Sequence, residues 1–263
     1  MALIAALLPD PADRASLTAA AAPHDVLWAG TWRELDRLVR VRPVAVAIAD
    51  LHSEARKDGV LRVLRFSQRF PLTPILVWGE LDGRSLYRLG KAGATDVIPA
   101  RDADDRHIII ELLDRSLGTG PATMISERLL GRVPEEARAL ISLAAEGVPG
   151  RIRVPDLART IRISVSSLER RCERWALPTP GRLLLWLRVL FGLHWLREPG
   201  RSIESVASQL GYSSGAAFRR ALRATLGDRP PPPRHDRSFE RALDAFIAEC
   251  TADRASHGPS SLD

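Results

Sequence analysis

The stretch from Ser202 to Gly227, which reads SIESVASQLGYSSGAAFRRALRATLG, has the pattern of two short helices joined by a turn. Gly211 tolerates the left-handed backbone that a tight turn needs, and Ser213 or Ser214 can cap the second helix. Apolar residues recur at helical spacing in two sets, Ile203, Val206, Ala207 and Leu210, and then Phe218 and Leu222. This stretch therefore predicts a helix-turn-helix unit.

A second stretch of the same kind lies about 50 residues earlier. Residues 153–174 read RVPDLARTIRISVSSLERRCER, with Leu157, Ala158 and Ile161 on the inner face of a first helix. The turn at 162–164 ends in a serine that can cap a second helix, which buries Leu168 and Cys172. Between the two stretches, residues 180–197 are almost all apolar and predict a buried connecting helix that sets the relative orientation of the two units.

Charged residues are spread unevenly along the 263 residues, which carry a net charge of +6. Lysine and arginine number 16 against 16 acidic residues in 1–118, 20 against 11 in 119–237, and 2 against 5 in 238–263. The excess positive charge thus lies in the segment with both predicted helix-turn-helix units. A basic segment of this kind predicts an anionic partner, most often nucleic acid. For any single arginine, a solvated helix face is the alternative interpretation.

Residues 135–235 resemble the two-unit DNA-binding domain of AraC-type transcription regulators. The resemblance rests mainly on Ile203-x-x-Val206-Ala207-x-x-Leu210-Gly211-Tyr212-Ser213, followed by Phe218-x-Arg220, Gly227-x-x-Pro230 and Arg234. It implies that one monomer places two recognition helices into successive major-groove segments of double-stranded DNA. By position, the base-reading candidates are Ser166, Glu169 and Arg170 in the first helix and Gly215, Ala216, Ala217 and Arg220 in the second. Further expected DNA-contacting residues are Ser164, Arg174, Ser214, Arg219 and Arg223.

The second helix departs from the AraC-type pattern, because Gly215-Ala216-Ala217 stands where polar base readers are usual. We expect this helix to rely on arginine contacts to phosphates and on packing against thymine methyl groups. Phosphate contacts position a protein on DNA without specifying sequence. The first helix is therefore expected to supply more of the sequence specificity.

Residues 1–118 alternate short apolar runs with amphipathic segments, which predicts a doubly wound α/β domain with a mostly parallel sheet. The segments between the runs have apolar residues at helical spacing, as in Leu35, Leu38 and Val39. The expected strands are the apolar runs 2–8, 25–29, 44–49, 74–78 and 96–98. A fifth helix is expected over 107–117.

This first half resembles the flavodoxin-like receiver domain of bacterial response regulators. Asp50 follows the third run, Asp58-Gly59 comes eight residues later, and Gly93-Ala94-Thr95-Asp96 leads into the fifth run. Phosphorylation of an aspartate needs Mg²⁺, and Mg²⁺ needs more than one carboxylate. The resemblance places Leu8-Pro9 at the receiver's acidic pair and Ala100 at its lysine, so Asp50 stands almost alone. We expect a pseudo-receiver used for dimerisation or partner binding.

Other classes of protein are disfavoured by composition. Two cysteines, Cys172 and Cys250, allow no disulfide framework, and the six scattered histidines include no helical metal pair. We expect no metal, no cofactor and no catalysis, because no nucleophile–base pair or phosphate loop is present. The apolar start 1–8 lacks the basic residues of a secretory signal, and 183–196 is too short and polar to span a membrane. The expected compartment is the cytoplasm.

The prediction is a sequence-specific DNA-binding transcription regulator. We expect a receiver-like domain over 1–118, a linker or loose helix over 119–133, an AraC-type domain over 134–235, and an accessory helix with a disordered tail over 236–263. A homodimer through the N-terminal domain and RNA polymerase are the further partners considered. Two alternatives stay open: a regulator switched by phosphorylation of Asp50, and a protein-interaction adaptor with reduced base readout.

Overall fold

A computed structural model describes residues 2–53, 59–99, 106–118, 120–227 and 237–252. The chain divides into two compact units. Unit 1 is Met1–Gly120 together with Glu198–Ser205, and unit 2 is Pro121–Arg197 together with Val206–Asp263. Among the described residues, no helix has both the length and the apolar character that crossing a membrane requires.

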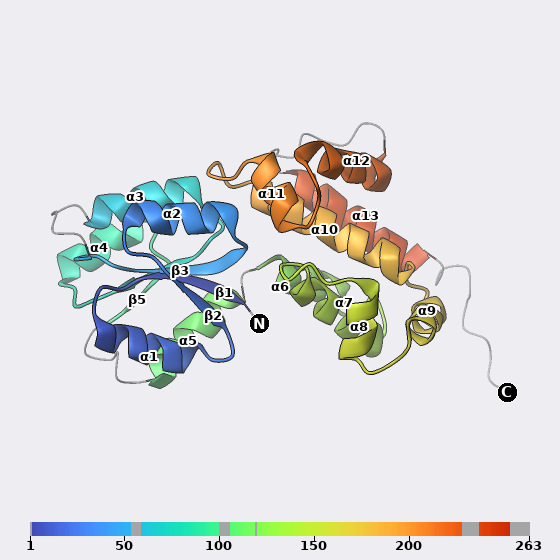
Figure 1. The fold of residues 1–263 in the computed structure, drawn as a ribbon, viewed down its shortest axis with the longest axis horizontal. Coiled ribbons are helices and arrows are strands. Elements are labelled where there is room, and N and C mark those ends of the chain that lie inside the picture. The colour runs from blue at the N-terminus through green and yellow to red at the C-terminus, as the bar shows by residue number, and fades with distance from the viewer. Residues whose placement is uncertain (1, 54–58, 100–105, 119, 228–236, 253–263) are drawn as a thin grey trace. The chain divides into compact units, whose positions relative to one another are not determined.

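Unit 1 is built on a parallel sheet with the strand order β2-β1-β3-β4-β5, drawn in Figure 1. This order is the doubly wound arrangement of flavodoxin-like folds. The strands are β1 (Leu3–Leu7), β2 (Asp25–Trp28), β3 (Val44–Asp50), β4 (Ile75–Trp78) and β5 (Asp96–Ile98). The helices are α1 (Pro11–Ala21), α2 (Trp32–Val41), α3 (Gly59–Arg69), α4 (Gly83–Ala92) and α5 (Arg106–Leu117).

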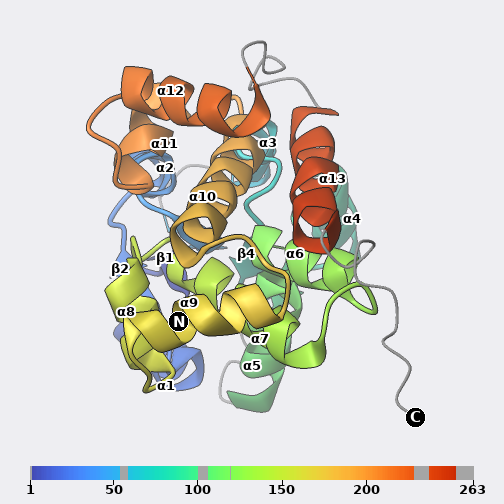
Figure 2. The ribbon, with the colours of Figure 1, turned by 90° about the vertical axis from the view of Figure 1, so that its right-hand side faces the viewer.

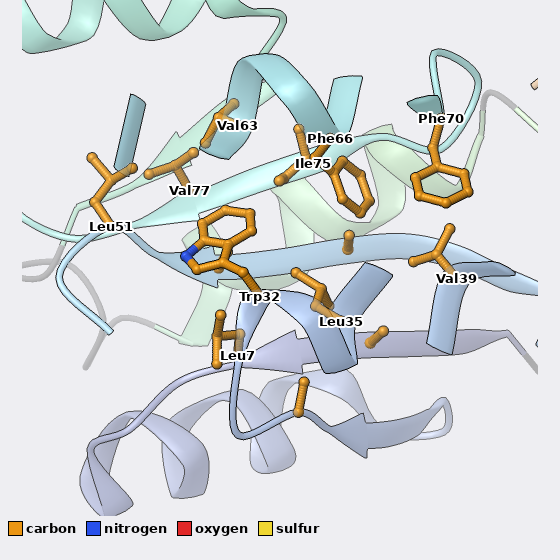
Figure 3. Close-up of a cluster of buried hydrophobic side chains, with 14 of the residues drawn as sticks. Leu7, Trp32, Leu35, Val39, Leu51, Val63, Phe66, Phe70, Ile75 and Val77 are labelled. Atoms are coloured by element: carbon orange, nitrogen blue, oxygen red, sulfur yellow. The ribbon is translucent and has the colours of Figure 1, made fainter. Parts of the chain in front are cut away.

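Side chains that alternate along each strand form two separate cores on the two faces of this sheet. Ala5 and Leu7 of β1 face α2, α3 and α4, whereas Ile4 and Ala6 face α1 and α5. On the first face, Trp32, Leu35 and Val39 of α2 and Val63 and Phe66 of α3 belong to one core cluster with Ile75 and Val77 of β4, as Figure 3 shows. Because both faces are covered, the strands are continuous apolar runs rather than alternating ones.

The segment Glu198–Ser205 belongs to unit 1 although it follows α10 in the sequence. Glu198 and Arg201 form an ion pair whose side chains are only 1% and 0% exposed. The Glu198 carboxylate also accepts hydrogen bonds from Thr73 Oγ1 at 2.7 Å and from the Leu72 amide at 3.2 Å. The Arg201 guanidinium donates to the Arg42 carbonyl at 3.2 Å. These partners offset much of the cost of burying two charges.

Unit 2 is entirely helical in its described residues, and Figure 2 shows its helices arranged around α10. The boundary between the two units falls within α11. The helices of unit 2 are α6 (Pro121–Leu129), α7 (Glu135–Gly147), α8 (Val154–Thr160), α9 (Val165–Arg174), α10 (Pro180–Leu196), α11 (Ile203–Gln209), α12 (Gly215–Leu226) and α13 (Arg237–Thr251).

The central helix α10 packs against α6, α7, α8, α9, α12 and α13. A helix surrounded by neighbours must be apolar on nearly all sides, and α10 buries residues around its whole circumference, from Leu183 and Trp186 to Phe191 and Leu196. At Gly192 the helix has no side chain, because the ring of Phe218 occupies that space. Gly192 is therefore where α12 approaches the backbone of α10.

The structure confirms the predicted fold class, a doubly wound parallel sheet followed by a helical region. Residues 119–133, expected to form a linker or loose helix, contain α6, and the expected accessory helix corresponds to α13. Four expectations lie outside the described residues: Asp58 of the receiver motif, Ala100 at the receiver lysine position, the motif residues Pro230 and Arg234, and the disordered tail beyond residue 252.

Replacing Gly192 with alanine is expected to destabilise unit 2. The added Cβ would lie 2.3 Å from Phe218 Cζ and 3.0 Å from Leu210 Cδ1. Alanine gains about 1 kcal/mol over glycine inside a helix, whereas overpacking costs about 1–3 kcal/mol, so we expect a net loss of about 1 kcal/mol. Urea unfolding followed by tryptophan fluorescence measures this change.

Gly181→Ala is the matched control, because a Cβ at that position of the same helix meets no atom within 4 Å. We expect Gly181→Ala to leave stability unchanged or to raise it by up to about 1 kcal/mol. Equal stability of the two variants would contradict the close approach of α12 to α10.

Candidate nucleic-acid interface

The first helix-turn-helix unit consists of α8 and α9. Leu157 and Ala158 of α8 and Leu168 and Cys172 of α9 are buried. At the turn, Arg162 takes the left-handed backbone with φ 55°. The Ser164 hydroxyl caps α9 by accepting a hydrogen bond from the Ser167 amide at 3.1 Å. The turn and the cap lie where the sequence predicts them.

The outward face of α9 is polar. Ser166, Glu169 and Arg170 are exposed, and the Arg170 guanidinium donates to Ser167 Oγ at 3.3 Å. Arg174 is also exposed, but together with Arg171 it borders a hollow of about 590 Å³ between α9 and α7. Arg174 thus lies toward the edge of α9, away from the centre of the face that Ser166 and Arg170 form.

The second helix-turn-helix unit consists of α11 and α12. Gly211 takes φ 83° in the turn, and the Tyr212 amide donates to the Ala207 carbonyl at 2.9 Å. Ser214, one of the two serines considered for the cap, caps α12 by accepting from the Ala217 amide at 3.2 Å. Phe218 and Leu222 are buried, as the apolar spacing predicts.

The predicted DNA-contacting residues of α12 do not all reach the surface. Ser214 and Ala216 are exposed and Ala217 is half-buried, but Gly215 is buried. Gly215 has no side chain to offer a base, and its contact with DNA stays a prediction. The exposed charges of α12 are Arg219, Arg220 and Arg223, and the helix contains no acidic residue.

Arg151, which motif analysis missed, joins the two helix-turn-helix units. Its guanidinium donates to the carbonyl oxygens of Ser208 at 2.7 Å and Gln209 at 3.3 Å, at the C-terminal end of α11. A cation at this end of a helix also offsets the partial negative charge of the helix dipole. Arg188 of α10 similarly donates to the Ile152 carbonyl at 2.7 Å, just before α8. Arg151 therefore links the two helix-turn-helix units to each other, and Arg188 links the start of the first of them to α10.

Glu249 of α13 is a second residue whose role the sequence did not reveal. Its carboxylate accepts two hydrogen bonds from Arg182 at 3.0 Å and one from Trp186 Nε1 at 2.7 Å, both on α10. Hydrogen bonding to the Arg182 guanidinium holds the pKa of the Glu249 carboxyl below its ordinary value. Arg182 also donates to the Ala224 carbonyl of α12 at 3.2 Å. The C-terminal helix is thus fastened to the helix that supports both units.

The two cysteines are packing residues in this arrangement. Cys172 of α9 is 1% exposed and Cys250 of α13 is fully buried. Burial raises the pKa of the Cys172 thiol to about 11 and that of Cys250 to about 12. Because the thiolate is the reactive form, neither side chain is suited to nucleophilic or redox chemistry at neutral pH.

In unit 1, Asp10 just after β1 and Asp50 at the end of β3 both accept hydrogen bonds from nearby backbone amides. Asp50, at the end of β3, accepts a hydrogen bond from the His52 amide at 2.8 Å. Asp10 instead caps α1, accepting from the Ala12 amide at 2.7 Å. In the part of the chain that the structure describes, no three acidic, histidine or cysteine residues are grouped as metal ligands would be.

Comparison with known proteins identifies the helical segment. Residues 157–231 match a protein-family model described as a helix-turn-helix domain, of the AraC type. This match confirms the resemblance of the segment to AraC-type domains and supports DNA-binding transcription regulation. No curated protein matches the chain.

Solved structures similar to this chain include three bacterial proteins. FixJ from B. japonicum is 15% identical with a TM-score of 0.38, covering 84% of this chain and 95% of that one. The RcsB response regulator from Salmonella typhimurium is 18% identical with a TM-score of 0.38, covering 71% and 98%. NtrX from Brucella abortus is 17% identical with a TM-score of 0.39, covering 61% and 39%. At these values the likenesses add nothing to what the sheet order of unit 1 shows.

Replacing Arg151 with alanine is expected to loosen the second helix-turn-helix unit. The change removes two hydrogen bonds from a charged donor at an exposed position, so we expect a loss of about 1 kcal/mol in stability. Backbone amides of residues 208–212 are expected to exchange with deuterium faster. Hydrogen–deuterium exchange of the full chain measures this effect.

Arg241→Ala, at an exposed position of α13, serves as the control and is expected to change stability by less than about 0.5 kcal/mol. If the amides of 208–212 exchanged at the same rate in Arg151→Ala and Arg241→Ala, Arg151 would not be holding the two helix-turn-helix units together.

Proposed function

We propose that this protein is a sequence-specific DNA-binding transcription regulator that inserts α9 and α12 into successive major-groove segments. The observation that carries the proposal is the pair of capped helices with exposed polar faces, both packed on α10. The match of residues 157–231 to a helix-turn-helix family supports it. A regulator of this kind works at the chromosome, so we propose the cytoplasm as its compartment.

The two helices are proposed to have different tasks. On α9, Arg170 can donate two hydrogen bonds to a guanine and Glu169 can accept from a cytosine. On α12, Ala216 and Ala217 offer only apolar contact, whereas Arg220 and Arg223 can neutralise phosphates. We therefore assign most of the base readout to α9 and most of the nonspecific attraction to α12. Each neutralised phosphate releases counterions, so affinity will fall steeply with salt.

Unit 1 is proposed to act as a pseudo-receiver that mediates dimerisation or binds a regulatory partner. Its sheet order is that of flavodoxin-like folds. Leu8 and Pro9 stand where a receiver has its acidic pair, and Asp50 is hydrogen-bonded to the His52 amide. Contact of the bound protein with RNA polymerase is a further part of this proposal.

Replacing Arg170 with alanine tests the assignment of α9. A bidentate contact to a base contributes about 1–3 kcal/mol of discrimination, so we expect a loss of that size confined to particular base pairs. Selection from a random duplex library gives the preferred sequence, and fluorescence anisotropy on its single-base variants gives the losses. Arg241→Ala is the control and should bind as the unchanged protein does.

A uniform loss across all duplexes would reassign Arg170 to the DNA backbone. If no duplex were retained even at low salt, the DNA-binding proposal would fail and the adaptor interpretation would replace it.

Incubation with acetyl phosphate and Mg²⁺ tests the pseudo-receiver. We expect no acid-labile phosphoryl group on the protein, because a lone aspartate does not supply the carboxylates that Mg²⁺ needs. Phosphate incorporation is measured with radiolabelled acetyl phosphate, and Asp50→Ala is the comparison. Incorporation that disappears in Asp50→Ala would instead establish a phosphorylation-switched regulator.

A further inference from the structure

Unit 1 carries a basic cleft that DNA binding by unit 2 does not account for. The cleft lies between α2 and α3 and has a volume of about 340 Å³. Four arginines line it, Arg33 on α2 and Arg62, Arg65 and Arg69 on α3, and among the described residues Asp36 is the one acidic residue of the lining. The helix α3 contains three arginines and no acidic residue. This local concentration is notable because residues 1–118 have equal numbers of basic and acidic residues.

The carboxylate in the cleft is already shared by two cations. Asp36 Oδ2 lies 2.6 Å from Arg69 Nη1 and 3.2 Å from Arg40 Nη2. Arg33 and Arg65 are exposed, and neither forms an ion pair with any residue in the described ranges. Two guanidinium groups on opposite helices therefore face the cleft with their charge uncompensated.

The position of Arg33 is unfavourable for a cation, although Glu34 in the same first turn of α2 offsets part of this effect. Thr31 caps α2, so Arg33 lies in the first turn of the helix. The helix dipole places partial positive charge at this end and disfavours a cation there by some tenths of a kcal/mol. Repulsion from the α3 arginines acts in the same direction. A bound anion would relieve both effects.

The floor of the cleft is apolar and firmly held. Trp32 and Phe66 form it, and their side chains are 5% and 3% exposed. Both belong to the core cluster beneath α2 and α3, as Figure 3 shows. An apolar floor lowers the local dielectric response, so a charge bound above it interacts more strongly than one in open water. The volume lies within the range of small-molecule sites, about 300–1,000 Å³.

We propose that this cleft binds a small molecule through a diphosphate group. A guanidinium presents paired N–H donors that match phosphate oxygens bidentately. Arg33 and Arg65 have no ion-pair partner in the described ranges, and Arg62 and Arg69 lie beside them. This arrangement favours a ligand group with more than the single negative charge of a carboxylate. The ligand class is a free pyrophosphate or the diphosphate of a nucleotide. The proposal is independent of DNA recognition by α9 and α12.

Titration calorimetry of the full chain with pyrophosphate and with ADP tests the proposal. We expect saturable binding at one site, weakened at least tenfold in the double variant Arg33→Gln with Arg65→Gln. Tighter binding of ADP than of pyrophosphate would identify a nucleotide as the source of the diphosphate, and equal binding would identify the free anion. Thermal unfolding checks that the variants are folded.

The matched control is Arg84→Gln with Arg88→Gln, which removes two exposed arginines from α4 of the same unit. We expect this control to change the affinity by less than twofold. Absence of saturable binding, or an equal loss in both double variants, would overturn the proposal. It would also be overturned if the cleft variant, and not the control, lost affinity for random duplex DNA, because the cleft would then belong to the DNA-binding surface.

Discussion

The apolar packing of α10 is the constraint on which the arrangement of unit 2 depends. Helices from both helix-turn-helix units contact it, as does α13, so most of its side chains are buried. Burying a polar group here would require a partner inside the bundle. Polar side chains of α10 do have partners: Arg182 bonds Glu249, Arg188 bonds the Ile152 carbonyl, and the buried His194 ring packs edge-on against Phe239. A close-packed interior has low compressibility, which suits a helix that must hold two others in a fixed relative position.

Local patterns in the sequence were sufficient to predict the elements and much of their arrangement. The strands are continuous apolar runs because both faces of the sheet are covered, and this can be recognised without knowing the neighbours. Ser164 and Gly211 were also recognisable, because a cap and a turn depend on backbone groups only a few residues away. These predictions were confirmed because each of these features depends on residues that lie close together in the sequence.

The residues that the sequence did not reveal have distant partners. Arg151 bonds carbonyl groups 57 and 58 residues away, and Glu198 bonds Leu72 and Thr73 at separations of 126 and 125. No periodicity records such pairings, and a charged residue in a loop is indistinguishable from a solvated one. The burial of Gly215 escaped notice for a related reason, because a position at the start of a helix is covered or exposed according to what packs beside it. Net charge conceals such detail too, because residues 1–118 carry no net charge and yet contain a basic cleft.

Because Glu198–Ser205 belongs to unit 1, that unit cannot be completed until late in the synthesis of the chain. A ribosome releases residues from the N-terminus onward, so the strands and helices of unit 1 emerge well before this segment does. Until residue 198 is synthesised, Thr73 and the Leu72 amide lack their carboxylate acceptor. A gene fragment that stops after residue 120 would encode the whole sheet and yet omit part of the unit it belongs to. Unit 1 thus consists of two separate segments of the sequence, and no single cut in the chain separates it from unit 2.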